Sequence, residues 1–215
     1  PTTPIKATTP VNKEEDYSRG EAIRTPTFWL LAISFSLATL SMGGFFANWL
    51  PYFQDIGFTA AVGSLAAVAY GIGSISVRLL WGLLSERYSV RHLLVIQAFL
   101  TAISVFFFLH ISGPTTLVLA GGFHGLAVGG FFIMRPLIIA NYFGRRHLGA
   151  VNSLFRPLTT ITSSLSPLLI AGLFDVYGSY LWAFTAVLTS WLLVGTIVGF
   201  ANPPTKTPAT ADLQI

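Results

Sequence analysis

Three arginines stand inside long apolar segments of the sequence, where a charged side chain is costly. Arg78 lies in "GIGSISVRLLWGLL", and Arg135 and Arg156 each precede a proline, in "FFIMRPLIIA" and "VNSLFRPLTT". A guanidinium group presents its donors in a planar fork that matches the two oxygens of a carboxylate. The chemistry that these residues could perform is therefore the reversible binding of an anion, which would also compensate their charge.

Polar residues accompany Arg156 along one face of its expected helix. Asn152, Arg156, Thr159, Ser163 and Pro167 follow the spacing of four, three, four and four residues that keeps side chains on one side of a helix. A helix surrounded by lipid would not keep such a stripe. The pattern predicts that the stripe lines either a helix interface or a water-filled cavity.

A fourth candidate, His124, precedes Arg135 by eleven residues, about three helical turns, so both would share a face of one continuous helix. As a histidine inside a span it is a candidate for proton coupling, although a histidine in such a place more often donates a hydrogen bond that bridges two helices. Gly121, Gly125 and Gly129 repeat every fourth residue in the same segment, which predicts close helix packing. Ser34, Ser41 and Asn48 form a second polar seam, either a helix contact or a cavity wall.

The composition indicates which class of protein must position these residues. Hydrophobic residues make up 53% of the chain and charged residues only 9%, too few for a soluble domain. The net charge of +4 is spread over short connectors, which favours membrane topology over nucleic-acid binding. The chain has no cysteine, no phosphate-cradling loop and no paired nucleophile and base. It therefore predicts neither an enzyme nor a metal or cofactor site.

Six segments are apolar and long enough to cross about 30 Å of hydrocarbon as helices. The connectors between them are short and contain the Gly, Pro and Asp that turns favour, which predicts helical hairpins. The predicted spans are residues 28–50, 60–84, 93–111, 116–140, 151–174 and 180–201. Helical rise places Arg78, Arg135 and Arg156 about 10 Å inward from the same side.

That side carries the basic connector residues. Arg87 and Arg91 lie in the second connector and Arg145 and Arg146 in the fourth, whereas the first, third and fifth contain no Lys or Arg. The positive-inside rule predicts that both termini and the even connectors face the cytoplasm, in a bacterial inner or plasma membrane.

The two ends of the chain differ in kind from the six-helix bundle predicted over residues 28–201. Residues 1–27 are predicted to be a cytoplasmic linker, the central loop of a longer chain, and residues 202–215 a flexible cytoplasmic tail. The stretch "DYSRGEAIRTPTFW" within the linker predicts a short helix lying along the membrane interface before Trp29.

The second connector, "GLLSERYSVRH", carries a charge cluster. Gly82 would let a neighbouring helix approach, and Glu86, Arg87 and Arg91 could pair across a hairpin tip and latch one bundle against another as a gating loop. The alternative is an ordinary basic connector. The segment resembles the G-x-L-S-D-R-x-G-R-R loop of the major facilitator superfamily, with Glu86 for the usual Asp and Ser89 for the usual Gly.

Other segments resemble the same family. "EAIRTPTFWLLAISF" is similar to the entry of the seventh helix, "YFGRRHLGAVNS" to the loop before the eleventh, and "SPLLIAGLFDVYGSY" to the turn into the twelfth. The resemblance implies an all-α membrane protein whose six transmembrane helices form the C-terminal half-bundle of a twelve-helix major facilitator fold. Within the family the chain resembles the monocarboxylate and oxalate:formate antiporter branch.

The resemblance also implies roles for single residues. Carriers of that branch have an arginine in the eighth helix that contacts the substrate carboxylate, which implies this role for Arg78, and a basic residue in the eleventh helix that corresponds to Arg156. An Asp one turn before the first arginine takes part in proton coupling in the monocarboxylate carriers. Ser74 stands there in this chain, which puts symport through that position in doubt. The expected substrate contacts are Arg78, Arg156, Arg135, Ser74 and Asn152.

Three functions are compatible with these residues. The leading one is a secondary active transporter that moves a small organic anion, a mono- or dicarboxylate, by alternating access, with symport and exchange both open. Its partners would be the lipid bilayer and an N-terminal six-helix half. The alternatives are a major facilitator exporter of drugs or other solutes with structural arginines, and a non-transporting six-helix membrane protein such as a sensor.

Overall fold

A computed structural model describes residues 16–205, so the distal parts of the predicted linker and tail, residues 1–15 and 206–215, lie outside the described residues. The described part contains helices and no strand. Six stretches in it are long and apolar enough to cross a membrane, which confirms the predicted spans and the all-α membrane class. The helices are α1 Arg19–Ile23, α2 Pro26–Ala47, α3 Trp49–Asp55, α4 Ala60–Arg87, α5 Val90–Phe108, α6 Pro114–Gly129, α7 Phe131–Phe143, α8 Leu148–Tyr177 and α9 Tyr180–Phe200.

Local sequence signals set where the long helices begin and end. The Thr25 side chain accepts a hydrogen bond from the backbone N–H of Phe28, and Pro26 occupies the first turn of α2, where its missing N–H costs nothing. Thr59 caps α4 in the same way. Gly178 ends α8 in the left-handed conformation, with φ of 63°, which a residue with a Cβ adopts poorly.

Two of the predicted spans are interrupted. The first ends at Ala47, and a separate short helix, α3, follows it. The Trp49 indole donates to the carbonyl of Gly63 at 3.3 Å, and the Tyr52 hydroxyl donates to that of Phe108 at 2.7 Å, so α3 is fixed against the ends of α4 and α5. Burial raises the pKa of the Tyr52 phenol to about 12, and this donor therefore stays protonated.

The second interruption divides the fourth predicted span into α6 and α7 at Gly129 and Gly130. Adjacent glycines weaken a helix because they lose the most backbone freedom on ordering. A Cβ on Gly130 would lie 2.7 Å from the indole nitrogen of Trp81, so the ring of α4 occupies the space that a side chain would need. Gly130 itself keeps helical φ and ψ of −63° and −33°, and the two assigned helices place His124 on α6 and Arg135 on α7.

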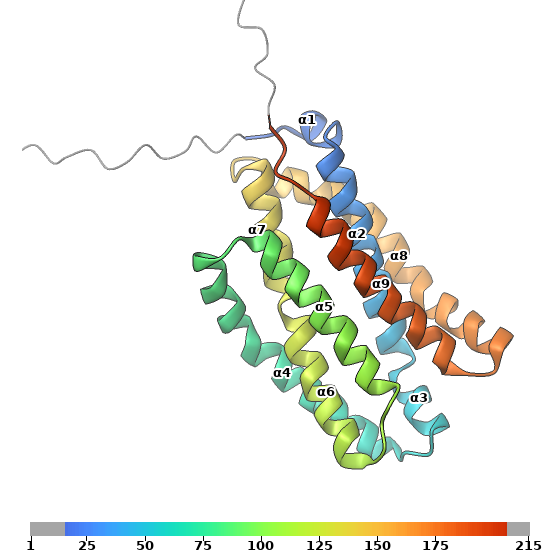
Figure 1. Ribbon diagram of the computed structural model, residues 1–215. Coiled ribbons are helices and arrows are strands. Elements are labelled where there is room, and N and C mark those ends of the chain that lie inside the picture. Colours follow the sequence, from blue (N-terminus) through green and yellow to red (C-terminus); the bar gives the residue numbers. More distant parts are fainter. Residues whose placement is uncertain (1–15, 206–215) are drawn as a thin grey trace, which may run out of the picture.

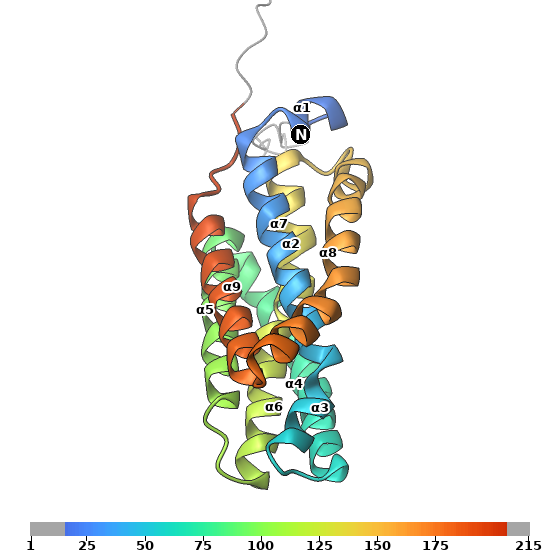
Figure 2. The same cartoon turned by 90° about the vertical axis from the view of Figure 1, so that its right-hand side faces the viewer.

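The helices pack as pairs, α4 on α6, α2 on α8 and α5 on α9. Figure 1 shows α4, α5 and α6 as one group, with α2, α8 and α9 beside it. Figure 2 shows α8 on the opposite side from α5 and α9, with α2 and α7 between them. The two described ends of the chain meet at one end of the bundle, where the Tyr17 hydroxyl donates to the carbonyl of Pro204 at 2.9 Å.

Glycines allow α4 and α6 to touch backbone to backbone. A Cβ on Gly121, Gly125 or Gly129 would collide with the carbonyl oxygen of Ala66, Tyr70 or Ser74 respectively. The predicted role of these three glycines in close packing is confirmed.

The polar stretch before Trp29 forms the expected short helix. Ser18 and Glu21 complete a capping box on α1, and the Ala22 side chain is fully buried against the bundle. Just before α1, the Asp16 carboxylate accepts from the backbone N–H of Arg146 at 3.1 Å, and the Tyr17 N–H donates to the carbonyl of Phe143 at 3.0 Å. This segment therefore binds the connector between α7 and α8.

Candidate functional site

A cavity of about 720 Å³ lies between α2, α7 and α8. Arg135 and Arg156 line it, and none of its lining residues is acidic. Both arginines are eight residues from the ends of their helices nearest α1, which places them about 12 Å along the helix axis from those ends. The remaining lining residues are Thr39, Met42, Gly43, Phe46, Phe131, Phe132, Pro136, Asn152, Thr159, Thr160 and Ser163.

Arg135 is the more enclosed of the two arginines. Its guanidinium carbon lies 5.2 Å from the centre of the buried Phe35 ring, and its Nε is buried without a hydrogen-bond partner among the described residues. The aromatic face supplies part of the missing countercharge. A cation–π contact leaves the in-plane N–H groups without acceptors, so the guanidinium keeps donors for a ligand in the cavity.

Arg156 lies across the cavity on α8, where its side chain is exposed. The two guanidinium groups are close enough for their positive charges to interact. Asn152, one turn before Arg156, adds an amide that donates and accepts hydrogen bonds. Two like charges and an amide facing one volume favour a ligand that carries negative charge.

The polar stripe predicted on α8 lines this cavity at four of its five positions, Asn152, Arg156, Thr159 and Ser163. The seam predicted on α2 does not. Ser34, Ser41 and Asn48 are buried between helices, and α2 contributes Thr39, Met42, Gly43 and Phe46 instead.

Arg78 lies beside the cavity without lining it. Its guanidinium carbon is 5.2 Å from the centre of the Phe132 ring, and Phe132 forms part of the cavity wall. Ser74 is buried and also lies outside the lining, with its carbonyl oxygen against Gly129. The structure thus brings together Arg135, Arg156 and Asn152 of the five predicted substrate contacts.

His124 is buried away from the cavity lining. Its Nδ1 lies 2.7 Å from the Ser104 hydroxyl, and that hydroxyl donates its single proton to the carbonyl of Thr101. The Nδ1–H of His124 therefore donates to Ser104, a hydrogen bond that bridges α6 to α5. Aromatic rings of Phe45, Phe46, Trp49, Tyr70 and Phe108 surround the imidazole.

Gly82 lies near the end of α4, and no neighbouring atom among the described residues lies within 4 Å of the position that a Cβ would take there. The approach of another helix to Gly82 therefore stays a prediction. Glu86 and Arg87 are exposed, and Arg91 donates to the Asn202 side chain, which joins the connector to the segment after α9. Whether these residues gate the protein stays a prediction.

Aromatic residues are the part of the site that sequence reasoning missed. Phe46, Phe131 and Phe132 form apolar walls of the cavity, although nothing distinguishes them in the sequence from the other phenylalanines. The spacing of Phe132 and Arg135, three residues on one helix, was the available signal. Among the described residues, no group of three His, Asp or Glu side chains could hold a metal ion.

Comparison with models of known protein families identifies the family of this chain. The model of the Major Facilitator Superfamily matches residues 24–214 of the chain. The chain belongs to the major facilitator superfamily. Its members are transporters, and the six apolar helices make this member an integral, multi-pass membrane protein.

A curated relative within this superfamily is the oxalate:formate antiporter of Oxalobacter formigenes. It is 30% identical over 76 residues, a stretch that covers 34% of this chain and 18% of that protein. The match thus spans less than a fifth of the relative's length.

Proposed function

We propose that the chain is one six-helix half of a secondary active transporter for small organic anions, with the cavity between α2, α7 and α8 as its half of the substrate site. The observation that carries the proposal is the pairing of Arg135 and Arg156 in a cavity that no acidic residue lines. In this arrangement a carboxylate would bind both guanidinium groups, and its charge would offset the cost of holding them in the membrane.

The shape of the cavity supports a small ligand. Its volume of about 720 Å³ falls within the range of about 300–1,000 Å³ found for small-molecule sites. Aromatic walls from Phe131 and Phe132 would exclude water around the bound carboxylate, which strengthens its contacts with the guanidinium groups. Oxalate and formate, named for the relative from Oxalobacter formigenes, are the first substrates to test.

The second half of the site would come from an N-terminal six-helix bundle, which we place in a longer chain or a partner chain. In carriers of this type the substrate lies near the midplane between two halves that rock around it. The proposal leaves proton coupling and exchange as separate possibilities, because His124 does not line the cavity. We further propose that both termini and the basic connectors face the cytoplasm.

Counterflow in proteoliposomes containing the full-length protein tests the proposal. Vesicles preloaded with oxalate, formate, lactate or pyruvate should take up the same labelled anion. Losing one charge-assisted contact costs about 1.5–3 kcal/mol of binding free energy. Arg135→Gln and Arg156→Gln should therefore each raise the substrate concentration for half-maximal uptake about ten- to hundredfold. Arg78→Gln should have a smaller effect, because Arg78 does not line the cavity.

Arg24→Gln is the matched control, since Arg24 is exposed outside the spans and far from the cavity lining. It should leave uptake unchanged. Saturable uptake that persists at normal affinity in both cavity variants would assign the arginines a structural role and contradict the proposal.

A further inference from the structure

A second hollow, an apolar groove of about 520 Å³, runs along α4, α5 and α6 and shares no lining residue with the anion cavity. We call it the α4–α6 groove. Its only polar side chains besides the Trp81 indole are Tyr88 and His92, which stand together beside the connector from α4 to α5. The full lining is Val77, Leu80, Trp81, Leu84, Tyr88, His92, Leu93, Ile96, Leu100, Phe123, Leu126 and Ala127.

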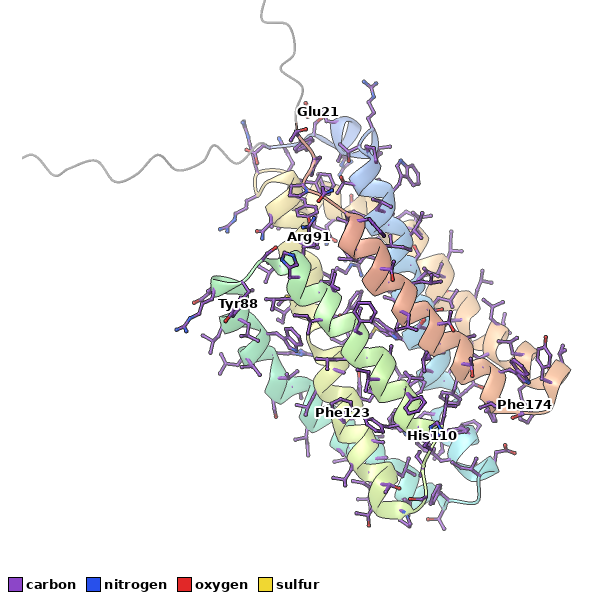
Figure 3. The ribbon with its side chains drawn as sticks, in the orientation of Figure 1. Glu21, Tyr88, Arg91, His110, Phe123 and Phe174 are labelled. Atoms are coloured by element: carbon purple, nitrogen blue, oxygen red, sulfur yellow. The ribbon has the colours of Figure 1, made fainter. Side chains whose placement is uncertain are left out.

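The groove reaches about one leaflet deep. From His92 to Leu100 the helix rises about 12 Å, close to half of the roughly 30 Å hydrocarbon thickness. Figure 3 marks the two ends, with Tyr88 at the connector and Phe123 further along α6. A transmembrane helix of another protein would need a groove that continues across both leaflets. An acyl chain of a lipid needs a groove that spans a single leaflet.

Positive charge collects at the connector end of the groove. Arg87 directly precedes Tyr88 and is exposed, so its guanidinium can reach a headgroup at the groove mouth. His92 lines the groove mouth, and Arg91 lies beside it, bonded to Asn202. Glu86 is the one acidic residue of this connector, so the charges of Arg87 and Arg91 outweigh it.

We propose that the α4–α6 groove binds an anionic phospholipid. One acyl chain lies along Trp81, Leu84 and Ile96, where it fills a volume that would otherwise forfeit dispersion contacts. The phosphate accepts hydrogen bonds from the Arg87 guanidinium, and the Tyr88 hydroxyl and the His92 ring face the rest of the headgroup. The lipid comes from the leaflet at the end of the bundle where α1 lies.

Trp81 provides a direct reporter, because its ring lines the groove and is only 5% exposed. Phospholipids with brominated acyl chains quench the fluorescence of a tryptophan that they contact. The full-length protein is reconstituted with increasing brominated phosphatidylglycerol or brominated phosphatidylcholine. The chain has five tryptophans, so the Trp81 signal is the difference between the wild-type protein and Trp81→Phe.

A surface basic residue contributes about 1 kcal/mol to binding an anionic lipid, so phosphatidylglycerol should quench Trp81 at about fivefold lower mole fraction than phosphatidylcholine. The double variant Arg87→Gln/His92→Gln should lose this preference, and Arg24→Gln, which removes a charge at the same end, should retain it. Leu126→Phe, which narrows the groove, should reduce quenching by both lipids. Leu83→Phe, exposed but outside the groove, should not.

Equal quenching by the two lipids in the wild-type protein would overturn the proposal, because it would identify ordinary surrounding lipid. Apart from the wild-type protein, this comparison needs only Trp81→Phe to fold, a replacement of one buried aromatic ring by another. Persistence of the preference in the double variant would also overturn it. Disulfide cross-linking of a Leu84→Cys variant to a second copy of the chain would also overturn the proposal, because it would show that a protein contact covers the groove.

Discussion

Arg78, Arg135 and Arg156 are indistinguishable by residue type and nearly so by depth, and the structure separates them by helix face. Arg135 and Arg156 line one cavity from two helices, whereas Arg78 lies over the Phe132 ring and does not line that cavity. The depth of each arginine follows from counting residues along its helix, so this depth could be predicted from the sequence. The face that each arginine presents depends on how α4, α7 and α8 are rotated about their axes, which is a property of the packed bundle.

His124 shows the same dependence on its surroundings. Its hydrogen bond to Ser104 and its aromatic neighbours favour a structural role as a bridge between α5 and α6. We expect Ser104→Ala and His124→Phe, the latter keeping a ring in the aromatic cluster, to be coupled in a double-mutant cycle by about 0.6 kcal/mol, and at most about 1.7 kcal/mol, as found for such bonds in membranes. The measurement is unfolding in mixed detergent micelles.

The competing role of His124 is proton coupling. It predicts that His124→Phe removes the pH dependence of transport while the free energy of unfolding stays unchanged and the coupling to Ser104 is zero. Loss of stability with an unaltered pH profile would support the bridge. The two roles thus give opposite results in the same pair of assays.

At the scale of helices, the sequence predicted six spans, and the bounds agree with the structure within a few residues except at two places. Apolar length determines a span, and it carries no information about the break at Gly129 and Gly130, where both halves are equally apolar. The contact of Trp81 of α4 with Gly130 is likewise not encoded in apolar length. From α7, the residues Phe131, Phe132 and Arg135 line the cavity.

The contact of α4 with α6 leads to a prediction with a built-in control. A Cβ on Gly125 would collide with the Tyr70 carbonyl oxygen, and backbone cannot move aside as a side chain can. Gly125→Ala should therefore destabilise the protein by about 1–3 kcal/mol, the usual cost of overpacking. Thermal unfolding in detergent measures the loss.

Gly122→Ala is the control, because it makes the same change one turn from Gly125 on the same helix. Its Cβ would meet only Ala69, at 3.8 Å, an ordinary van der Waals distance. The gain in helix propensity is the same for both variants. If Gly125→Ala were as stable as Gly122→Ala, the two helices would not pack as closely as the structure shows.

For the whole molecule, the distribution of exposed side chains explains why the bundle is expected to need a second half. The spans of α4 and α8 are the least buried of the six, whereas the span formed by α6 and α7 is the most buried. Yet α8 carries the polar stripe on one of its uncovered faces, where Arg156 and Ser163 are exposed. Lipid chains offer no hydrogen-bond partners to the polar side chains of such a face. A second bundle or an aqueous path over the cavity would supply those partners.

The orientation of the molecule in the membrane can be tested with single introduced cysteines, because residues 1–215 contain no cysteine of their own. Ser89 and Ser112 are exposed serines that flank opposite ends of α5. The basic residues Arg87, Arg91, Arg145 and Arg146 gather at the Ser89 end. Because positive connectors remain inside, a membrane-impermeant maleimide should label Ser112→Cys in intact cells and Ser89→Cys only after permeabilisation.

Each variant serves as the control for the other, since both replace an exposed serine and differ only in the side of the membrane. The reverse labelling pattern would place the basic connectors outside. It would also move the α4–α6 groove to the outer leaflet, where the negative surface potential of the cytoplasmic leaflet is absent and Arg87 would lose much of its attraction for lipid. The orientation therefore decides which leaflet could supply the proposed phospholipid, and the fluorescence experiment would then need the lipid placed on that side.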